Sequence, residues 1–126
     1  MKNFFVILLL SAVVFTGCKE NTTTDINGTY QRLYRFQDHD YQVELSLTTD
    51  GQLNWRPLDS IPGHQSSTVK YMLQSGKQFK IYEDTDCNSE AIYDYVLSNE
   101  QLSLSSASDS CQNRKMALTG DWTKVK

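Results

Sequence analysis

Apolar side chains alternate with polar ones along most of the chain after Gly28, and this pattern restricts the fold more than any other feature. Val43, Leu45 and Leu47 are separated by single polar residues, and the same spacing recurs in several later segments. A period of two places every second side chain on one face of an extended strand. No 11-residue window shows the three-and-four spacing of a helix, and the frequent tyrosines and threonines favour strands. The sequence therefore predicts an all-β domain.

Short turn-forming sequences divide this domain into eight expected strands. Tight hairpins are predicted at Gly51, Gly76 and Asn99. The expected strands are 28–36, 41–48, 52–58, 68–74, 78–83, 91–97, 101–106 and 114–124. Consecutive antiparallel strands of this number can close into an up-and-down β-barrel, which removes both exposed edges. The tight hairpins would then lie at one end, and the longer connections from Gln37, Asp59, Asp84 and Ser106 at the other.

The N-terminal segment has the pattern of a signal peptide. Lys2 precedes an apolar run from Phe4 to Phe15, which is shorter than the roughly 20 residues that cross a membrane. The sequence that follows, Phe15-Thr16-Gly17-Cys18, resembles the lipobox of bacterial lipoproteins. That resemblance implies cleavage before Cys18 and acylation of its side chain, and several acyl chains give stable anchoring. The alternative is an ordinary secreted protein with a free cysteine.

These observations divide the chain into three parts. Residues 1–17 are the expected lipoprotein signal peptide, 18–27 a lipidated flexible tether, and 28–126 the barrel domain. The expected location is the bacterial cell envelope, with lipid anchoring at the outer membrane and neither face indicated. Membrane lipid, through acylated Cys18, is the first expected partner.

Export also bears on the two remaining cysteines. Cys87 and Cys111 would be the only pair in an oxidising compartment, so we expect one disulfide between them. Both fall in connections at the long-loop end of the predicted barrel, which makes the pairing geometrically reasonable. A thiol metal site is the less favoured alternative, because no C-x-x-C spacing is present.

Later segments resemble the small lipocalin-like, calycin-type lipoproteins of bacteria. The similarity covers "INGTYQRLYRF", "DGQLNW" and residues 84–125. The matching positions are Cys87, Tyr93, Leu102, Leu104, Asp109, Cys111, Arg114, Leu118, Gly120 and Trp122. This resemblance implies an eight-stranded lipocalin-like barrel and no particular ligand. The chain departs from it at Tyr30, where tryptophan is common, and we expect Arg114 to stack on Trp122.

Composition and motifs argue against several functions. The net charge of −3 gives no basic surface for nucleic acid. The sequence contains no G-x-S-x-G, no H-E-x-x-H, no phosphate-binding glycine loop and only two histidines, so no enzyme activity and no cofactor are expected. His39, His64, Asp84, Asp86 and Asp109 fall at the long-loop end, but Asp-rich loops are usually solvated turns, and no metal is expected. Asp94 is either an inward carboxylate or an outward one paired across strands.

Two kinds of non-enzymatic function remain. The first is binding of a small hydrophobic molecule, with Trp55, Tyr71 and Tyr93 as the candidate contacts. Most aromatic residues are nevertheless expected to fill the core, since an eight-stranded barrel is only just wide enough for its own side chains. The alternative is a protein-interaction module, an envelope assembly subunit or an inhibitor, that contacts its envelope partner through the long-loop rim.

Overall fold

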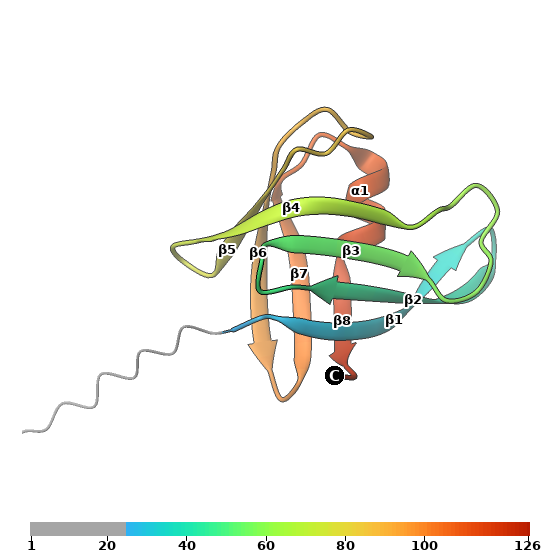
Figure 1. The fold of residues 1–126 in the computed structure, drawn as a ribbon. Helices are drawn as coiled ribbons and strands as arrows, with labels where there is room; N and C mark the ends of the chain where they lie inside the picture. Colours follow the sequence, from blue (N-terminus) through green and yellow to red (C-terminus); the bar gives the residue numbers. More distant parts are fainter. Residues whose placement is uncertain (1–24) are drawn as a thin grey trace, which may run out of the picture.

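The computed structural model describes residues 25–126 as eight strands and one short helix (Figure 1). The strands are β1 (Gly28–Phe36), β2 (His39–Leu47), β3 (Gln52–Pro57), β4 (Ser67–Gln74), β5 (Gln78–Tyr82), β6 (Ala91–Ser98), β7 (Gln101–Ser108) and β8 (Gly120–Lys124), and helix α1 (Gln112–Leu118) precedes β8. The predicted signal peptide, Cys18 and most of the tether lie outside the described residues. Within the described range, no helix has the length and apolarity needed to cross a membrane.

The strands form a closed antiparallel up-and-down barrel, which confirms the predicted fold class. Each strand pairs with the next along the chain, and β8 closes the barrel by pairing with β1 through Tyr30↔Lys124 and Gln31↔Thr123. The turns after β2, β4 and β6 lie at one end, here called the tight-turn end. The connections after β1, β3, β5 and β7 lie at the opposite, long-loop end.

The first connection at the long-loop end is shorter than predicted. Only Gln37 and Asp38 separate β1 from β2, and their φ angles are 48° and 62°. Positive φ at both central residues is the geometry of the two-residue turns that match strand twist. The expected longer loop from Gln37 is therefore wrong, and His39 begins β2.

The predicted last strand, 114–124, is wrong in its first half, because residues Gln112–Leu118 form α1. The segment QNRKMAL is rich in good helix formers. It buries Arg114 and Leu118, which are four residues apart on one face. Seven residues are too few to produce an apolar pattern in an 11-residue window, so periodicity could not reveal this helix.

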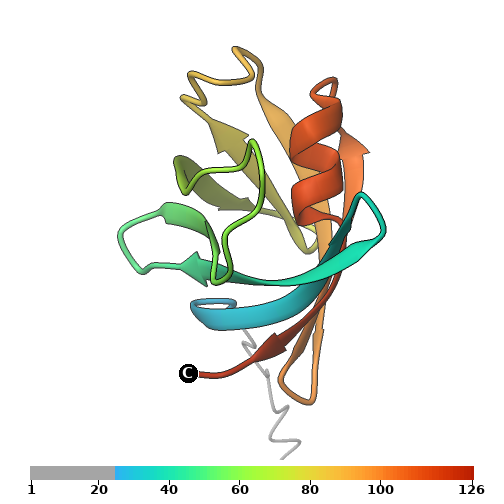
Figure 2. The same cartoon turned by 90° about the vertical axis from the view of Figure 1, so that its right-hand side faces the viewer.

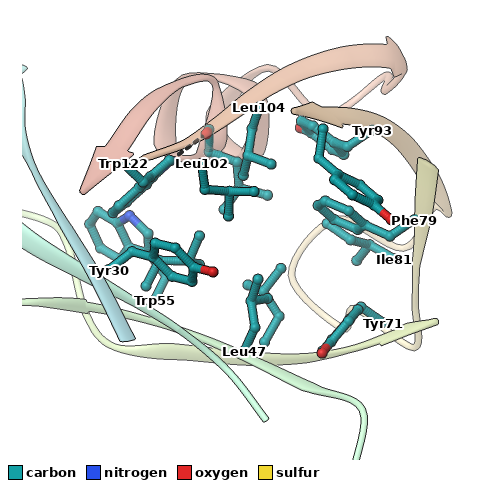
Figure 3. Close-up of a cluster of buried hydrophobic side chains, with 14 of the residues drawn as sticks. Tyr30, Leu47, Trp55, Tyr71, Phe79, Ile81, Tyr93, Leu102, Leu104 and Trp122 are labelled. Atoms are coloured by element: carbon teal, nitrogen blue, oxygen red, sulfur yellow. Dashed lines mark hydrogen bonds between the residues drawn. The ribbon is translucent and has the colours of Figure 1, made fainter. Parts of the chain in front are cut away.

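Large apolar side chains point into the barrel from strands on all sides (Figure 3). Tyr30, Phe79, Tyr93 and Trp122 are each 0% exposed. The Phe79 and Tyr93 rings are stacked, with centroids 5.7 Å apart. Aromatic residues therefore supply much of the core of the barrel.

The tight-turn end is closed by the chain as it enters the barrel. Ile26 is fully buried, and the Tyr30 hydroxyl donates to its carbonyl oxygen at 2.8 Å. The Tyr71 hydroxyl lies 2.7 Å from Asn27 Oδ1 and 3.0 Å from the Thr48 carbonyl oxygen. Packing against the barrel therefore begins at Ile26, two residues before β1.

Arg32, rather than Arg114, stacks on Trp122. The Arg32 guanidinium carbon lies 4.7 Å from the centroid of the Trp122 ring. Its Nη2 donates to the carbonyl oxygens of Met116 and Ala117, at 3.0 and 2.8 Å, in the last turn of α1. The stacking role predicted for Arg114 is therefore wrong, and Arg114 is free to take the different role described below.

Candidate functional site

A cavity of about 350 Å³ opens at the long-loop end of the barrel. It is bounded by the end of β1, by β3 and β4 as far inward as Leu53 and Val69, by α1, and by the β3–β4 and β5–β6 loops. Figure 2 shows this helix and these loops around the same end of the barrel. The cavity has one side that is apolar and aromatic and another side that is charged, and the two sides come from different elements.

Four rings, Tyr34, Phe36, Trp55 and His64, form the aromatic wall of the cavity. Tyr34 and Phe36 alternate near the end of β1, and Trp55 faces the same space from β3. The centroids of Tyr34 and Trp55 are 5.8 Å apart, in edge-to-face contact. Such pairs contribute about 1 kcal/mol beyond the burial of their area.

His64 brings the β3–β4 loop onto this wall. Its ring centroid lies 4.5 Å from that of Phe36 and 5.5 Å from that of Tyr34. Nδ1 is 3.0 Å from the Pro62 carbonyl oxygen, and Nε2 is 3.3 Å from the Tyr34 hydroxyl. Since a carbonyl oxygen can only accept, Nδ1 carries the proton in the neutral ring and Nε2 accepts from Tyr34. These contacts hold the loop over one side of the cavity.

The charged side of the cavity is built around Arg114. Nε and Nη2 donate to the two oxygens of Asp109, at 2.9 and 2.7 Å. Nη1 donates to Asp84 Oδ2 at 2.9 Å and to the Ser89 carbonyl oxygen at 2.9 Å. Nη2 also lies 3.3 Å from Ser89 Oγ. All five N–H groups of the guanidinium are therefore used within the protein.

The environment keeps this network charged. Burial by itself would raise the pKa of Asp109, but hydrogen bonds from Arg114, Tyr93 and the Cys111 backbone lower it below its usual value. The hydrogen bond to Asp109 is the largest cause of the raised pKa of Arg114. Burial first, and the bond to Asp109 second, raise the pKa of Tyr93. The group therefore consists of two carboxylates, one guanidinium and a neutral phenol that donates to Asp109.

The expected cysteine pair holds the two halves of this network together. Cys87 and Cys111 are joined by a disulfide, with 5.8 Å between their Cα atoms. Asp84 Oδ1 accepts from the backbone N–H of Cys87 at 3.3 Å, and Asp109 Oδ1 accepts from that of Cys111 at 2.8 Å. Each aspartate therefore shapes the loop of its own cysteine. The disulfide places both carboxylates beside Arg114.

The structure does not bring the three predicted ligand contacts together. Trp55 lines the cavity, but Tyr71 and Tyr93 are not part of its lining. Tyr71 reaches toward the tight-turn end, and the Tyr93 hydroxyl donates to Asp109. Phe79 packs between them, with its centroid 6.0 Å from that of Tyr71 and 5.7 Å from that of Tyr93.

Two other residues that the sequence singled out, His39 and Asp94, lie outside the cavity lining. His39 lies at the start of β2, and Asp94 faces away from the core and accepts from Gln78 Nε2 at 2.8 Å. Across residues 25–126, no three His, Cys, Asp or Glu side chains are arranged to hold a metal ion. Tyr34 and Phe36 could have been found as cavity residues from their alternation at the end of β1.

No protein-family model matches the chain, and comparison with curated proteins gives no match either. The function must therefore be argued from the barrel and the chemistry of its cavity.

Proposed function

We propose that this protein is a lipid-anchored, non-enzymatic binding module of the bacterial cell envelope that takes a small, largely apolar molecule in its rim cavity. The observation that carries the proposal is the cavity of about 350 Å³ with its aromatic wall. Ligand sites are typically concave, of roughly 300–1,000 Å³, and mostly apolar with a few fixed polar groups. The rim cavity has the same size and composition.

The walls of the cavity are rigid before a ligand arrives. The Cys87–Cys111 disulfide and the Arg114 hydrogen bonds fix the charged side, and the contacts of His64 fix the β3–β4 loop. Preorganised walls reduce the entropy that binding must overcome. The cavity opens at the long-loop end and extends inward to Leu53 and Val69, so a ligand would enter from the rim.

The anchor proposal concerns the opposite end of the molecule. The chain enters the barrel at the tight-turn end through Ile26, so a lipid on Cys18 would direct the cavity away from the membrane. Labelled palmitate should be incorporated into the wild-type protein, and not into a Cys18→Ala variant. Equal labelling of both proteins would refute acylation at Cys18.

The binding proposal is tested with the neutral fluorescent probe N-phenyl-1-naphthylamine. We expect saturable fluorescence enhancement with the wild-type protein. Ala117→Trp, which fills the cavity from α1, should weaken binding at least about tenfold, or about 1.4 kcal/mol. Ala107→Trp is the matched control, because Ala107 is exposed on β7 and does not line the cavity.

The result is interpreted only for variants whose thermal melting matches that of the wild type. Absence of saturable binding to the folded wild-type protein would refute the cavity as a binding site. The long-loop rim would then be tested as a surface for an envelope protein partner.

A further inference from the structure

We propose that the rim cavity selects amphipathic organic cations, which place an apolar ring on the aromatic wall and an ammonium group beside Asp86. This inference rests on the proposed function and adds the sign of the ligand's charge. It follows from three features: the balance of charge around the cavity, the free carboxylate of Asp86, and the faces of the neighbouring rings.

The charge around the cavity is negative. Its charged lining residues are Asp84, Asp86 and Arg114. Arg114 directs its hydrogen bonds to Asp84, Asp109 and Ser89, and its side chain is only 6% exposed. Asp84 and Asp109 therefore compensate the guanidinium, which has no donor left for a ligand, and Asp86 adds a further negative charge to the lining.

Asp86 is the carboxylate placed to meet a ligand. It lines the cavity and also the adjoining surface depression beside His64 and Gln65. Its backbone N–H donates to Asp84 Oδ1 at 3.0 Å, which fixes its place in the loop. Among the side chains of residues 25–126, none forms a hydrogen bond or ion pair with its carboxylate. It is exposed and available as an acceptor.

The aromatic wall completes a site for a cation. The rings of Tyr34, Phe36 and Trp55 border the same cavity as Asp86. The face of an aromatic ring attracts a cation, most strongly where water is partly excluded. An ammonium group on an apolar ring would therefore meet both an opposite charge and favourable ring faces.

A ligand carboxylate meets the reverse situation. Among residues 25–126, Arg114 is the one lysine or arginine that lines the cavity. An anion would approach Asp84 and Asp86 and lose water without gaining a hydrogen-bond donor from a cation. Like charges at an interface discriminate against a ligand as effectively as attractive contacts favour one. Fatty acids are therefore expected to bind poorly.

Three probes with the same ring test the inference: 1-naphthylmethylammonium, 1-naphthylmethanol and 1-naphthoate. Their dissociation constants are measured by isothermal titration calorimetry on the purified full chain with its disulfide intact. We expect the ammonium compound to bind at least about tenfold more tightly than the carboxylate, or about 1.4 kcal/mol. The alcohol should lie between them.

Two charge-removing variants assign the effect. Asp86→Asn should remove most of the preference for the ammonium compound. Asp38→Asn removes the same charge from the β1–β2 turn, outside the cavity lining, and should keep the preference. Asn also tolerates the positive φ of 62° at that position.

The outcomes separate this inference from the proposed function. If all three compounds bind equally, or the carboxylate binds best, charge selection is overturned while the cavity remains a binding site. If the preference survives in Asp86→Asn, the role of Asp86 is overturned. If none of the three binds, the cavity proposal and this inference both fail.

Discussion

The two ends of the barrel are closed in different ways. At the tight-turn end, Ile26 is fully buried, and its carbonyl oxygen accepts a hydrogen bond from the buried Tyr30. At the long-loop end, a disulfide and the Arg114 network join the β5–β6 loop to the segment that leads into α1, and a cavity lies beside them. Burial of apolar side chains closes the tight-turn end, whereas a disulfide and ion pairs fix the loops at the long-loop end.

This difference explains how a barrel with a packed core can still offer a binding site. An eight-stranded barrel is just wide enough for its own side chains or for one small ligand, and here the cavity extends from the rim to Leu53 and Val69 of the core. Hydrogen bonds and a disulfide can fix loops without filling the space between them. The long-loop end therefore combines rigidity with an open cavity, and a change at each end should have different consequences.

The largest effect is expected from removing Arg114. In Arg114→Ala, Asp84 and Asp109 would be left as buried carboxylates, with side-chain exposures of 6% and 0%, without their cation. Breaking a buried pair in this way typically costs about 3–5 kcal/mol. The free energy of unfolding in urea should fall by about that amount. The free energy of unfolding of Arg114→Lys should lie between those of the wild type and Arg114→Ala, since lysine keeps the charge but lacks the planar fork of donors.

Arg35→Ala is the control for this experiment. Arg35 pairs with Asp40 at 3.3 Å, but its side chain is 65% exposed. Exposed ion pairs contribute at most about 1 kcal/mol. If Arg114→Ala were as mild as Arg35→Ala, the Arg114 network would not be what frames the long-loop end.

A smaller effect is expected at the other end from Ile26→Ala. Truncation of buried aliphatic side chains costs about 2–5 kcal/mol. We expect the free energy of unfolding to fall by about 2 kcal/mol, because Ile26 lies close to where the packed chain begins and its neighbours can partly fill the space. Urea unfolding measures this loss, and titration with N-phenyl-1-naphthylamine should show unchanged affinity.

Leu33→Ala is the matched aliphatic control, since Leu33 is 57% exposed on β1. Its effect should stay within about 0.5 kcal/mol. A loss of probe affinity in Ile26→Ala at full folding would show that the two ends are coupled, contrary to the comparison.

The sequence predicted the tight-turn end better than the long-loop end. Alternation and the turns at Gly51, Gly76 and Asn99 identify strands from neighbouring residues alone. Such local patterns give the closed barrel, because consecutive antiparallel strands need no long-range information to be ordered. The two-residue turn at 37–38 was missed because its residues, Gln and Asp, are not a strong hairpin signal.

The candidate site depends on contacts that no local pattern contains. Arg114 and Asp84 are 30 residues apart, and nothing near either residue names the other as its partner. The cysteines gave the best indication, since Asp84 precedes Cys87 by three residues and Arg114 follows Cys111 by three. The predicted Cys87–Cys111 pair brings these charges to the same part of the barrel, whereas the cavity itself depends on the positions of α1 and the β3–β4 loop.

The smallest expected effect is a fall in the free energy of unfolding at acid pH, which we attribute to Asp109 at the long-loop end. The pKa of Asp109 is lowered in the folded protein, and an unfolded aspartate titrates at about 3.9. As the pH falls, the unfolded chain therefore binds the proton first. The stabilisation is present above about pH 4 and is lost as the pH falls through the folded pKa. Urea unfolding at a series of acid pH values should show a slope of at most about 1.4 kcal/mol per pH unit from this group.

Asp109→Asn should remove this part of the slope, because its side chain cannot ionise. Tyr93→Phe should remove a portion, since the Tyr93 hydroxyl is one of the donors that lower the pKa of Asp109. Ile26→Ala should lower the free energy of unfolding by the same amount at every pH, because Ile26 lies at the opposite end of the barrel and does not titrate. The slope against pH should therefore not change. If Ile26→Ala altered the slope as much as Asp109→Asn does, acid sensitivity would belong to the barrel as a whole rather than to the end that carries the cavity.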